Sequence, residues 1–460
     1  MPKSKVTKPS VKIEEKAAEP KKRSSKHPQL LRGMKDILPE SQKYWSYVRK
    51  LVEQLAEDYT YEMIDTPILE ETSLFTRSVG ENTDIVEKEM FSFEDKSGMN
   101  VSMRPENTAG IVRAYIEHGM LDRPQPVRLF YWGPFFRYDR PQAGRYRQFH
   151  QFGFEAIGDN NPIIDAQLIV MCQSIYNTIG IPVVTQINSV GCKKCRKDYE
   201  QLFTDYLSSR KKFLCEDCKR RLIKNPLRVL DCKVKECKEI LADAPHIVDH
   251  LDEECKEHFV KVLEYLDEAD IAYQLNPFLV RGLDYYTRTT FEIWPEKDDG
   301  SQSAMGGGGR YDDLTEMLGG RPTPACGFAG GVERLVISMR EKEIVIPAPE
   351  PPDVFVAQLG ESAKKKALRL VEDLRAKGIR AASNFSKEGL KYQLSVAARL
   401  RVKFSLILGQ KEMLDKTILL RDMEGGSQEV IDYNKVYVEL KNRLEKTKAI
   451  IQNRNNHTEE

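Results

Sequence analysis

The feature that most constrains this chain is a run of four consecutive glycines, Gly306–Gly309, followed at once by Arg310-Tyr311-Asp312-Asp313. Glycine has no Cβ atom, so such a run lets the backbone approach a ligand or another backbone closely, although it costs conformational entropy on folding. A strand with a glycine-rich turn would explain the glycines alone. The preceding segment, 279–292, however, sets an arginine, an aspartate and two adjacent tyrosines between aliphatic residues. Together the two segments predict a pocket for a small polar ligand.

The length and composition describe a globular protein of several domains. The 460 residues are enough for two or three domains, and the contents of 40% hydrophobic and 31% charged residues are ordinary for such proteins. No apolar run approaches the roughly 18 residues that a membrane span needs, and the polar N-terminus is not a secretory signal. We therefore expect a cytoplasmic protein without membrane contact.

The charge is unevenly distributed along the chain. The net charge is only +1, but residues 1–27 carry +6, residues 353–460 carry +6 and residues 28–352 carry −11. A basic end domain on an acidic body indicates that one domain meets a polyanion. Ordinary solvated surface lysines would give the same balance.

Hydrophobic spacing divides the chain into segments. Residues 1–27 are predicted to be a disordered basic tail. Helical spacing begins at Tyr44, and strand-like segments follow. These features predict an α+β core with a largely antiparallel sheet flanked by helices over 28–345, interrupted by a Cys-rich helical insertion at about 188–255. The predicted strands of this core lie at Tyr59–Ile64, at Met103, at Val127–Trp132 and at Phe149–Ile157.

The C-terminal part is predicted to be a separate domain. Residues 346–352 contain four prolines and form the predicted linker. The pattern then predicts a small α/β domain with a mainly parallel sheet over 353–447. Its predicted elements are strands at Asp353–Gln358, Ile379–Ser383 and Val402–Leu408 and a helix at 361–377. Residues 448–460 are predicted to be a disordered tail.

Two arginine-bearing segments favour phosphate binding. Residues 128–155 contain five arginines interleaved with aromatic residues, and arginine both donates bidentately to phosphate and stacks on adenine. A solvated basic hairpin is the alternative. In the second segment, 327–334, glycines precede a predicted helix whose first turn carries Arg334, and a helix N-terminus favours anions.

A third segment, 103–110, carries a carboxylate and a hydroxyl. Glu106 and Thr108 are two residues apart, so on a strand they would point to the same face. Both could then contact the same polar ligand. Alternatively, Glu106 pairs with Arg104.

These segments resemble, in family order, the motifs of class II aminoacyl-tRNA synthetases. The helix and strand over 41–67, ending at Pro67, resemble motif 1. Phe136-Arg137-Tyr138-Asp139 resembles motif 2, with aspartate in place of the usual glutamate, and the segment with Arg334 resembles motif 3. Segments 279–292 and 306–313 resemble the histidine-specific signatures of the histidyl-tRNA synthetase family. The resemblance covers nearly all of residues 30–447.

The resemblance implies a reaction and the residues that perform it. It implies ATP-dependent attachment of L-histidine to tRNA(His) through a histidyl-adenylate, with ATP as substrate and Mg²⁺ present. It implies that Arg281 is catalytic, because it would contact the reacting α-phosphate. The implied ATP-binding residues are Arg137, Asp139 and Arg334. The implied histidine-binding residues are Glu106, Thr108, Gln151, Glu155, Tyr285, Tyr286 and Tyr311.

The resemblance also implies partners and an assembly. The C-terminal domain would bind the anticodon of tRNA(His), and two copies would form a homodimer through the motif 1 segment. Two other classes of protein compete with this interpretation. A non-catalytic synthetase-like regulatory subunit of histidine biosynthesis typically loses the Arg281 segment and the C-terminal domain, and this chain keeps both. A nucleic-acid-binding module without catalysis would leave the glycine run unexplained.

Six of the nine cysteines lie between residues 192 and 237. Cys192 and Cys195 form one Cys-x-x-Cys pair, and Cys215 and Cys218 form another. This spacing is typical of a structural zinc site, so these four cysteines are predicted to hold one Zn²⁺. Cys232 and Cys237 could compete as ligands. Small apolar residues packed in a helical insertion are the alternative.

Overall fold

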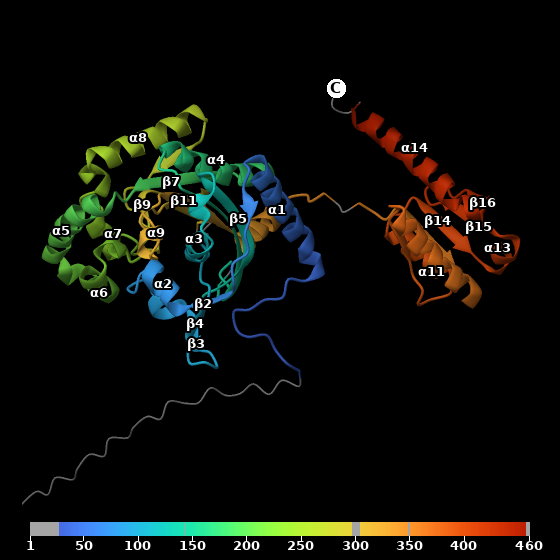
Figure 1. Ribbon diagram of the computed structural model, residues 1–460, viewed down its shortest axis with the longest axis horizontal. Coiled ribbons are helices and arrows are strands. Elements are labelled where there is room, and N and C mark those ends of the chain that lie inside the picture. Colours follow the sequence, from blue (N-terminus) through green and yellow to red (C-terminus); the bar gives the residue numbers. More distant parts are fainter. Residues whose placement is uncertain (1–26, 143, 297–303, 348–349, 457–460) are drawn as a thin grey trace, which may run out of the picture. The chain divides into compact units, whose positions relative to one another are not determined.

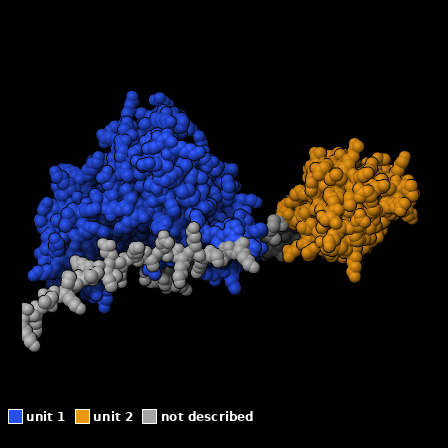
Figure 2. Space-filling model, turned by 90° about the horizontal axis from the view of Figure 1, so that it is seen from below, with its two compact units in different colours: residues 1–346 blue, residues 347–460 orange. Residues whose placement is uncertain are grey.

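The computed structural model describes residues 27–142, 144–296, 304–347 and 350–456 (Figure 1). The chain divides into two compact units after Ile346, which Figure 2 shows in separate colours. The predicted N-terminal tail lies outside the described residues except for His27.

An eight-stranded sheet organises the first unit. Its strand order is β1-β5-β6-β11-β10-β9-β7-β8, and every pair is antiparallel except β1–β5 and β7–β8 at the two edges. The predicted antiparallel core is therefore confirmed. The strands are β1 (Glu62–Met63), β5 (Val127–Phe136), β6 (Gln148–Ile157), β7 (Val183–Ser189), β8 (Tyr273–Leu275), β9 (Thr287–Pro295), β10 (Gly306–Arg310) and β11 (Ala325–Gly331).

Side-chain alternation along these strands builds two cores. Phe130 belongs to one apolar cluster and its neighbour Tyr131 to another, because successive residues of a strand face opposite sides of the sheet. The first cluster includes helices α1 (Pro39–Asp58), α4 (Pro162–Ile179), α8 (Glu253–Glu268) and α10 (Val332–Glu341). Helix α1 contributes Trp45, Val48, Val52 and Ala56, whose spacing of three or four residues keeps them on one face.

The opposite face carries the smaller elements and the insertion. The second cluster takes in α3 (Thr108–Glu117) and the helices between β7 and α8, namely α5 (Lys193–Ser209), α6 (Glu216–Lys224) and α7 (Lys235–Leu241). This segment is helical, as the sequence predicted. The remaining elements are α2 (Thr72–Val79), α9 (Leu314–Met317) and a three-stranded sheet of β2 (Leu69–Glu71), β4 (Asn100–Met103) and β3 (Phe91–Glu94).

The second unit is a five-stranded sheet with helices. Its order is β13-β12-β14-β15-β16, with β12 parallel to both of its neighbours and the other pairs antiparallel. The sheet is therefore mixed, whereas the sequence predicted a mainly parallel one. The strands are β12 (Val354–Gln358), β13 (Ala381–Ser383), β14 (Phe404–Leu408), β15 (Thr417–Asp422) and β16 (Gln428–Asp432), and the helices are α11 (Glu361–Ala376), α12 (Leu390–Arg399), α13 (Gln410–Asp415) and α14 (Val436–Asn456).

Two further predictions differ from the structure. Helix occupies residues 448–456, because α14 continues to Asn456, where the sequence predicted a disordered tail; residues 457–460 lie outside the described part. The strand predicted at Tyr59–Ile64 is reduced to the two residues of β1, since α1 continues to Asp58 and a turn follows. Among the described helices, none is both long enough and apolar enough to cross a membrane.

Candidate functional site

The four glycines form the central strand β10, between β9 and β11. A Cβ atom on Gly308 would lie 2.0 Å from the carbonyl oxygen of Gly327, and one on Gly307 would lie 2.6 Å from that of Phe291. A side chain at either position would therefore clash with the backbone of a neighbouring strand, β11 or β9. A Cβ atom on Gly307 would also lie 2.3 Å from Nη1 of Arg281. Because Gly307 has no side chain, the Arg281 guanidinium can occupy the space beside it.

Arg281 is held in place by its neighbours. Its Nη1 donates to Oε1 of Glu292 at 2.9 Å, and its guanidinium carbon lies 5.6 Å from the ring centroid of Tyr286. The Arg281 side chain is only 17% exposed. A buried, fixed guanidinium is suited to charge stabilisation because it needs little reorganisation when an anion arrives.

A cavity of about 490 Å³ lies over this part of the sheet. Five of the residues that the resemblance singled out line it: Arg137, Asp139, Gln151, Arg281 and Arg334. Gly306 and Gly307 form part of its floor, so the backbone of β10 is directly accessible to a ligand. The cavity has the size of a small-molecule site.

Three buried N–H groups around this cavity have no hydrogen-bond partner among the described residues. They are Nε of Arg281, Nε1 of Trp294 and Nη1 of Arg228. An unpaired buried donor is unfavourable, and such groups are rare in folded proteins. Three of them around one cavity indicate a ligand rich in acceptors.

Guanidinium groups lie close together in one part of the cavity wall, among the acidic residues that also line it. Burial, together with the neighbouring Arg145 and Arg137, lowers the pKa of Arg334 to about 10, so the three guanidinium groups repel one another. Arg137 is fixed by donating to the carbonyl oxygen of Pro105 at 2.9 Å. Arg334 donates to the carbonyl oxygen of Ala304 and lies in the first turn of α10, as predicted. A polyphosphate would relieve this repulsion.

Asp139 lies in the cavity wall but is occupied by its own loop. Its carboxylate accepts from Nη1 of Arg145 at 3.2 Å and from the backbone N–H of Arg140 at 2.6 Å. The loop between β5 and β6 thus holds Asp139 and Arg145 together in the cavity wall.

The other six predicted residues form a buried cluster. Thr108 donates to Oε1 of Glu155 at 2.9 Å, and the hydroxyl of Tyr311 donates to Oε2 of the same carboxylate. Tyr285 donates to Glu106 at 3.4 Å, and its ring lies 4.7 Å from that of Tyr286 and 5.6 Å from that of Tyr311, between centroids. The structure therefore brings together tyrosines, a threonine and two carboxylates from four separate segments.

Glu106 and Thr108 are not on a strand, in contrast to the prediction. Strand β4 ends at Met103, and Thr108 begins α3. The Glu106 carboxylate accepts from the backbone N–H groups of Thr108 at 2.7 Å and Ala109 at 3.1 Å, which would otherwise be unpaired at the start of a helix. The alternative pairing with Arg104 is not made, because Arg104 donates to the carbonyl oxygens of Pro134 and Thr66.

Within this cluster, the surroundings of Glu155 shift its pKa strongly upward. Burial raises its pKa to about 8, an effect that the nearby Glu106 strengthens and the donors Tyr311 and Thr108 reduce. Gly327 permits this burial, since a Cβ atom there would lie 1.7 Å from Oε2 of Glu155. A carboxyl group whose pKa lies near neutral pH can change its protonation state when a polar ligand binds beside it.

Several cavity residues were missed by the sequence analysis. Glu292 ends the segment 279–292, and Trp294 lies two residues further along β9. This spacing was the available signal, because such residues share one face of a strand. Arg228, Asp231 and Lys233 come from the insertion, which contains none of the motifs identified in the sequence. Their only signal was a group of charged residues around Cys232.

The predicted four-cysteine zinc site is wrong in its grouping. Cys192 and Cys195 lie with Asp252 and Cys255, whereas Cys215 and Cys218 lie with Cys232 and Cys237. The physical reason is α5, a helix of 17 residues between the two Cys-x-x-Cys pairs, which spans roughly 26 Å.

Comparison with known proteins identifies relatives of both units. The sequence profile described as Histidyl-tRNA synthetase matches residues 33–194 and 196–335, and the profile described as Anticodon binding domain matches residues 353–443. The histidine–tRNA ligase of Dehalococcoides mccartyi strain 195 is 46% identical over 414 residues, which are 90% of this chain and 99% of the relative. That of Pelotomaculum thermopropionicum is 44% identical over 90% of this chain and 97% of the relative.

A solved structure agrees with these sequence matches. The apo histidyl-tRNA synthetase of S. aureus superposes with a TM-score of 0.76 at 38% sequence identity, covering 90% of this chain and 100% of that one. Both profiles, the full-length relatives and the shared fold point to one conclusion: the chain belongs to the histidyl-tRNA synthetase family.

Proposed function

We propose that this protein attaches L-histidine to tRNA(His) at the expense of ATP. The observation that carries the proposal is the cavity with three unpaired buried N–H donors and five arginines, adjoining the buried tyrosine and carboxylate cluster. The first part suits a nucleoside triphosphate, and the second suits a small polar amino acid. The relatives named histidine–tRNA ligase and the anticodon-binding profile support the tRNA substrate.

The first half-reaction forms histidyl-adenylate. The histidine carboxylate attacks the α-phosphorus of ATP, and pyrophosphate leaves. Arg281 would balance the charge that develops on the α-phosphate, while Arg137 and Arg334 would hold the nucleotide. Mg²⁺ would supply further charge neutralisation when it binds with ATP, and the carboxylate of Glu89 in the cavity wall would coordinate it.

The second half-reaction transfers histidine to tRNA. The terminal hydroxyl of the tRNA attacks the adenylate carbonyl, and AMP leaves. Because the amino acid must stay in place through both steps, its selection depends on the buried cluster. Glu106 and Glu155 supply acceptors and the Tyr286 hydroxyl supplies a donor for a neutral imidazole, which has one N–H and one bare nitrogen. An analogue that leaves such groups unpaired is rejected by roughly 10⁴-fold or more in favourable cases.

Histidine-dependent exchange of labelled pyrophosphate into ATP, without tRNA, tests this function. We expect exchange with histidine and none with glutamine or without an amino acid. A regulatory subunit of histidine biosynthesis would give no exchange, and neither would a module that only binds nucleic acid. A folded protein that fails to exchange in the presence of histidine, ATP and Mg²⁺ contradicts the proposal.

We also propose a cytoplasmic homodimer. Strand β1 is an edge strand, and the apolar side chains of Met63, Ile68 and Leu69 nearby are 41–47% exposed. A second copy would cover these side chains by pairing through α1 and β1. Sedimentation should give twice the chain mass, and a stable, active monomer would refute the dimer.

A further inference from the structure

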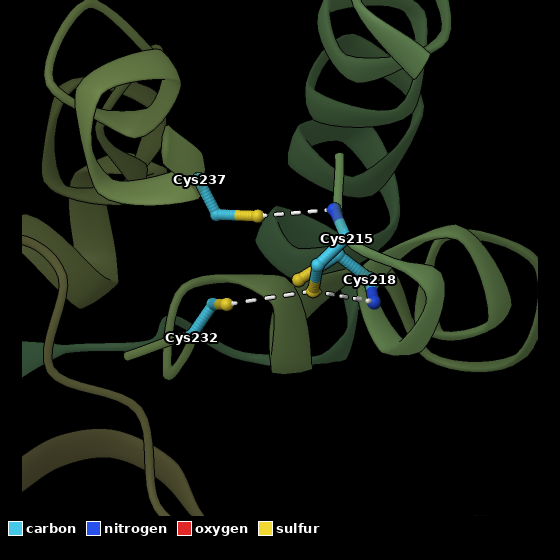
Figure 3. Close-up of side chains that lie close together, drawn as sticks. All are labelled: Cys215, Cys218, Cys232 and Cys237. Atoms are coloured by element: carbon cyan, nitrogen blue, oxygen red, sulfur yellow. Dashed lines mark hydrogen bonds between the residues drawn. The ribbon is translucent and has the colours of Figure 1, made fainter. Parts of the chain in front are cut away.

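Four cysteines of the insertion converge on one point, as Figure 3 shows. The sulfur atoms of Cys215, Cys218, Cys232 and Cys237 all lie within 4.8 Å of one another. They come from separate elements, because Cys215 and Cys218 stand at the start of α6, Cys232 lies in a loop and Cys237 lies in α7. Three of the four side chains are buried, and Cys215 is partly exposed.

The spacing of the four sulfur atoms suits a tetrahedral metal. Zn–S bonds of roughly 2.3 Å place tetrahedral sulfur atoms about 3.8 Å apart. Sγ of Cys215 lies 3.9 Å from Sγ of Cys232. The backbone N–H of Cys218 donates to Sγ of Cys215 at 3.4 Å, and that of Cys215 donates to Sγ of Cys237 at 3.3 Å. Such bonds stabilise thiolates and orient metal ligands.

The surrounding charge offsets that of a metal–thiolate group. Zn²⁺ with four thiolates carries a net charge of about −2. Residues 211–238 contain ten Lys or Arg and four Asp or Glu, a net charge of +6. This excess of cations favours an anionic centre over four neutral thiols.

We propose that Cys215, Cys218, Cys232 and Cys237 bind one Zn²⁺, which fixes a wall of the proposed nucleotide cavity. Cys232 lies between Asp231 and Lys233, and both neighbours line that cavity. Arg228, four residues earlier, also lines it and donates to Asp84 at 3.2 Å. The metal ties this loop to α6 and α7, so it positions three cavity residues without touching the substrate.

A second group of ligands carries a separate proposal. Cys192, Cys195, Asp252 and Cys255 also place their ligand atoms within 4.8 Å of one another. Sγ of Cys192 lies 3.6 Å from Sγ of Cys195 and 3.4 Å from Oδ2 of Asp252. Oδ1 of Asp252 accepts from the backbone N–H of Cys255, which leaves Oδ2 directed toward the sulfur atoms. We infer a second zinc site with three thiolates and one carboxylate.

The second site closes the base of the insertion. Cys192 lies just after β7, where the chain enters the insertion, and Cys255 lies in the first turn of α8, where it leaves. One metal would thus join the two ends of the insertion, and the other would fix its distal loop. Packing of small apolar residues does not need such convergence, since Cys172 and Cys326 are buried in the core as single cysteines.

Metal analysis of the full-length protein, purified without chelator, tests both sites. Elemental analysis should find about two equivalents of zinc per chain. Zinc absorption spectroscopy should give an average of about 3.5 sulfur neighbours and 0.5 oxygen neighbours. Absence of zinc from the wild-type protein overturns both proposals, and disulfides detected in place of free thiols in freshly purified protein would do the same.

Single substitutions separate the two sites. Cys237→Ser should remove the four-thiolate metal, and Cys255→Ser should remove the other, each lowering the content to about one equivalent. Cys172→Ala, a buried cysteine outside both groups, is the matched control and should leave two. If a variant fails to fold, the wild-type metal content and sulfur number still decide. Two equivalents that survive Cys237→Ser contradict the four-thiolate assignment.

The effect of the four-thiolate metal on the cavity wall can be measured separately, and this measurement rests on the proposed function. Cys237→Ser should raise KM for ATP in pyrophosphate exchange about tenfold, a usual penalty for residues that act through a metal's surroundings. Cys255→Ser should change it less. An unchanged KM in a variant that has lost one zinc would show that the metal does not position the cavity wall. Loss of zinc with no exchange in any variant, wild type included, would refute the proposed function instead.

Discussion

Arg281 combines burial, a fixed position and an unpaired donor. Glu292 and the Tyr286 ring hold its guanidinium, and its buried Nε has no partner among the described residues. We therefore expect Arg281→Ala to lower the rate of pyrophosphate exchange roughly 100- to 1,000-fold, because a lost charge-stabilising donor typically costs about 3–4 kcal/mol in the transition state. Arg369→Ala is the control, since Arg369 is an exposed arginine of the second unit that pairs with Asp373. Normal exchange by a folded Arg281→Ala variant would exclude the catalytic role.

Glu155 should make the stability of the ligand-free protein depend on pH. Its pKa is about 8 in the folded protein against an ordinary 4.5, so the folded state binds this proton more tightly than the unfolded state. The resulting stabilisation is complete below pH 4.5 and is lost as the pH rises through about 8. Glu155→Gln cannot ionise, so its free energy of unfolding should fall less steeply over this range.

Denaturant unfolding at several pH values measures this difference. The slope for the wild type should exceed that of Glu155→Gln by up to about 1.4 kcal/mol per pH unit. Glu257→Gln changes an exposed glutamate of α8 and serves as the comparison. Parallel curves for the wild type and Glu155→Gln would mean that Glu155 ionises normally in the folded protein.

At the scale of elements, β10 requires glycine for a reason that can be measured. A Cβ atom on Gly307 would meet Phe291 and Arg281, whereas one on Gly331 would have no neighbour closer than 3.7 Å. Gly307→Ala should therefore lower the free energy of unfolding by about 1–3 kcal/mol, and Gly331→Ala should change it by less than about 0.5 kcal/mol. Equal effects would show that the crowding around β10 is relieved by small shifts.

The elements that the sequence predicted correctly are those with a strong local signal. Long strands such as β5 and β6 and the amphipathic helix α1 have one, as does the helix start at Arg334. The hairpin of β15 and β16 was missed because its outer strand is mostly exposed and polar. Glu106 was assigned to a strand because its role in α3 depends on backbone hydrogen bonds, which spacing in sequence does not reveal.

The residues of the candidate site also divide into those with a local signal in the sequence and those whose position depends on the folded chain. The motif residues could be named in advance, but Arg228, Asp231 and Lys233 could not, because their approach to the cavity depends on how the insertion folds back on the sheet. The grouping of the cysteines was hidden for a related reason. Asp252 and Cys255 lie far from Cys192 in the sequence and meet it only because the insertion returns to its own starting point.

At the scale of the whole molecule, the first unit should carry out the chemistry and the second unit should bind the tRNA. Every residue that lines the cavity belongs to the first unit, whereas residues 353–460 carry a net charge of +6 and match the anticodon-binding profile. Removal of residues 353–460 should abolish tRNA charging while pyrophosphate exchange stays within a few-fold of normal. Thermal unfolding of the shortened chain is the control. Equal losses in both assays would mean that the second unit stabilises the first.

The three unpaired N–H groups around the cavity favour nucleotide binding but lower the stability of the ligand-free protein. Each buried donor without a partner costs about 1–3 kcal/mol, and a ligand that accepts from it recovers that free energy. The empty enzyme is therefore less stable than its fold permits, and ATP should raise its melting temperature. Trp294→Phe, which deletes one such donor and keeps an aromatic ring, should resist heat better while binding ATP more weakly. In this enzyme, selection for a stiffer resting state would act against selection for tight nucleotide binding.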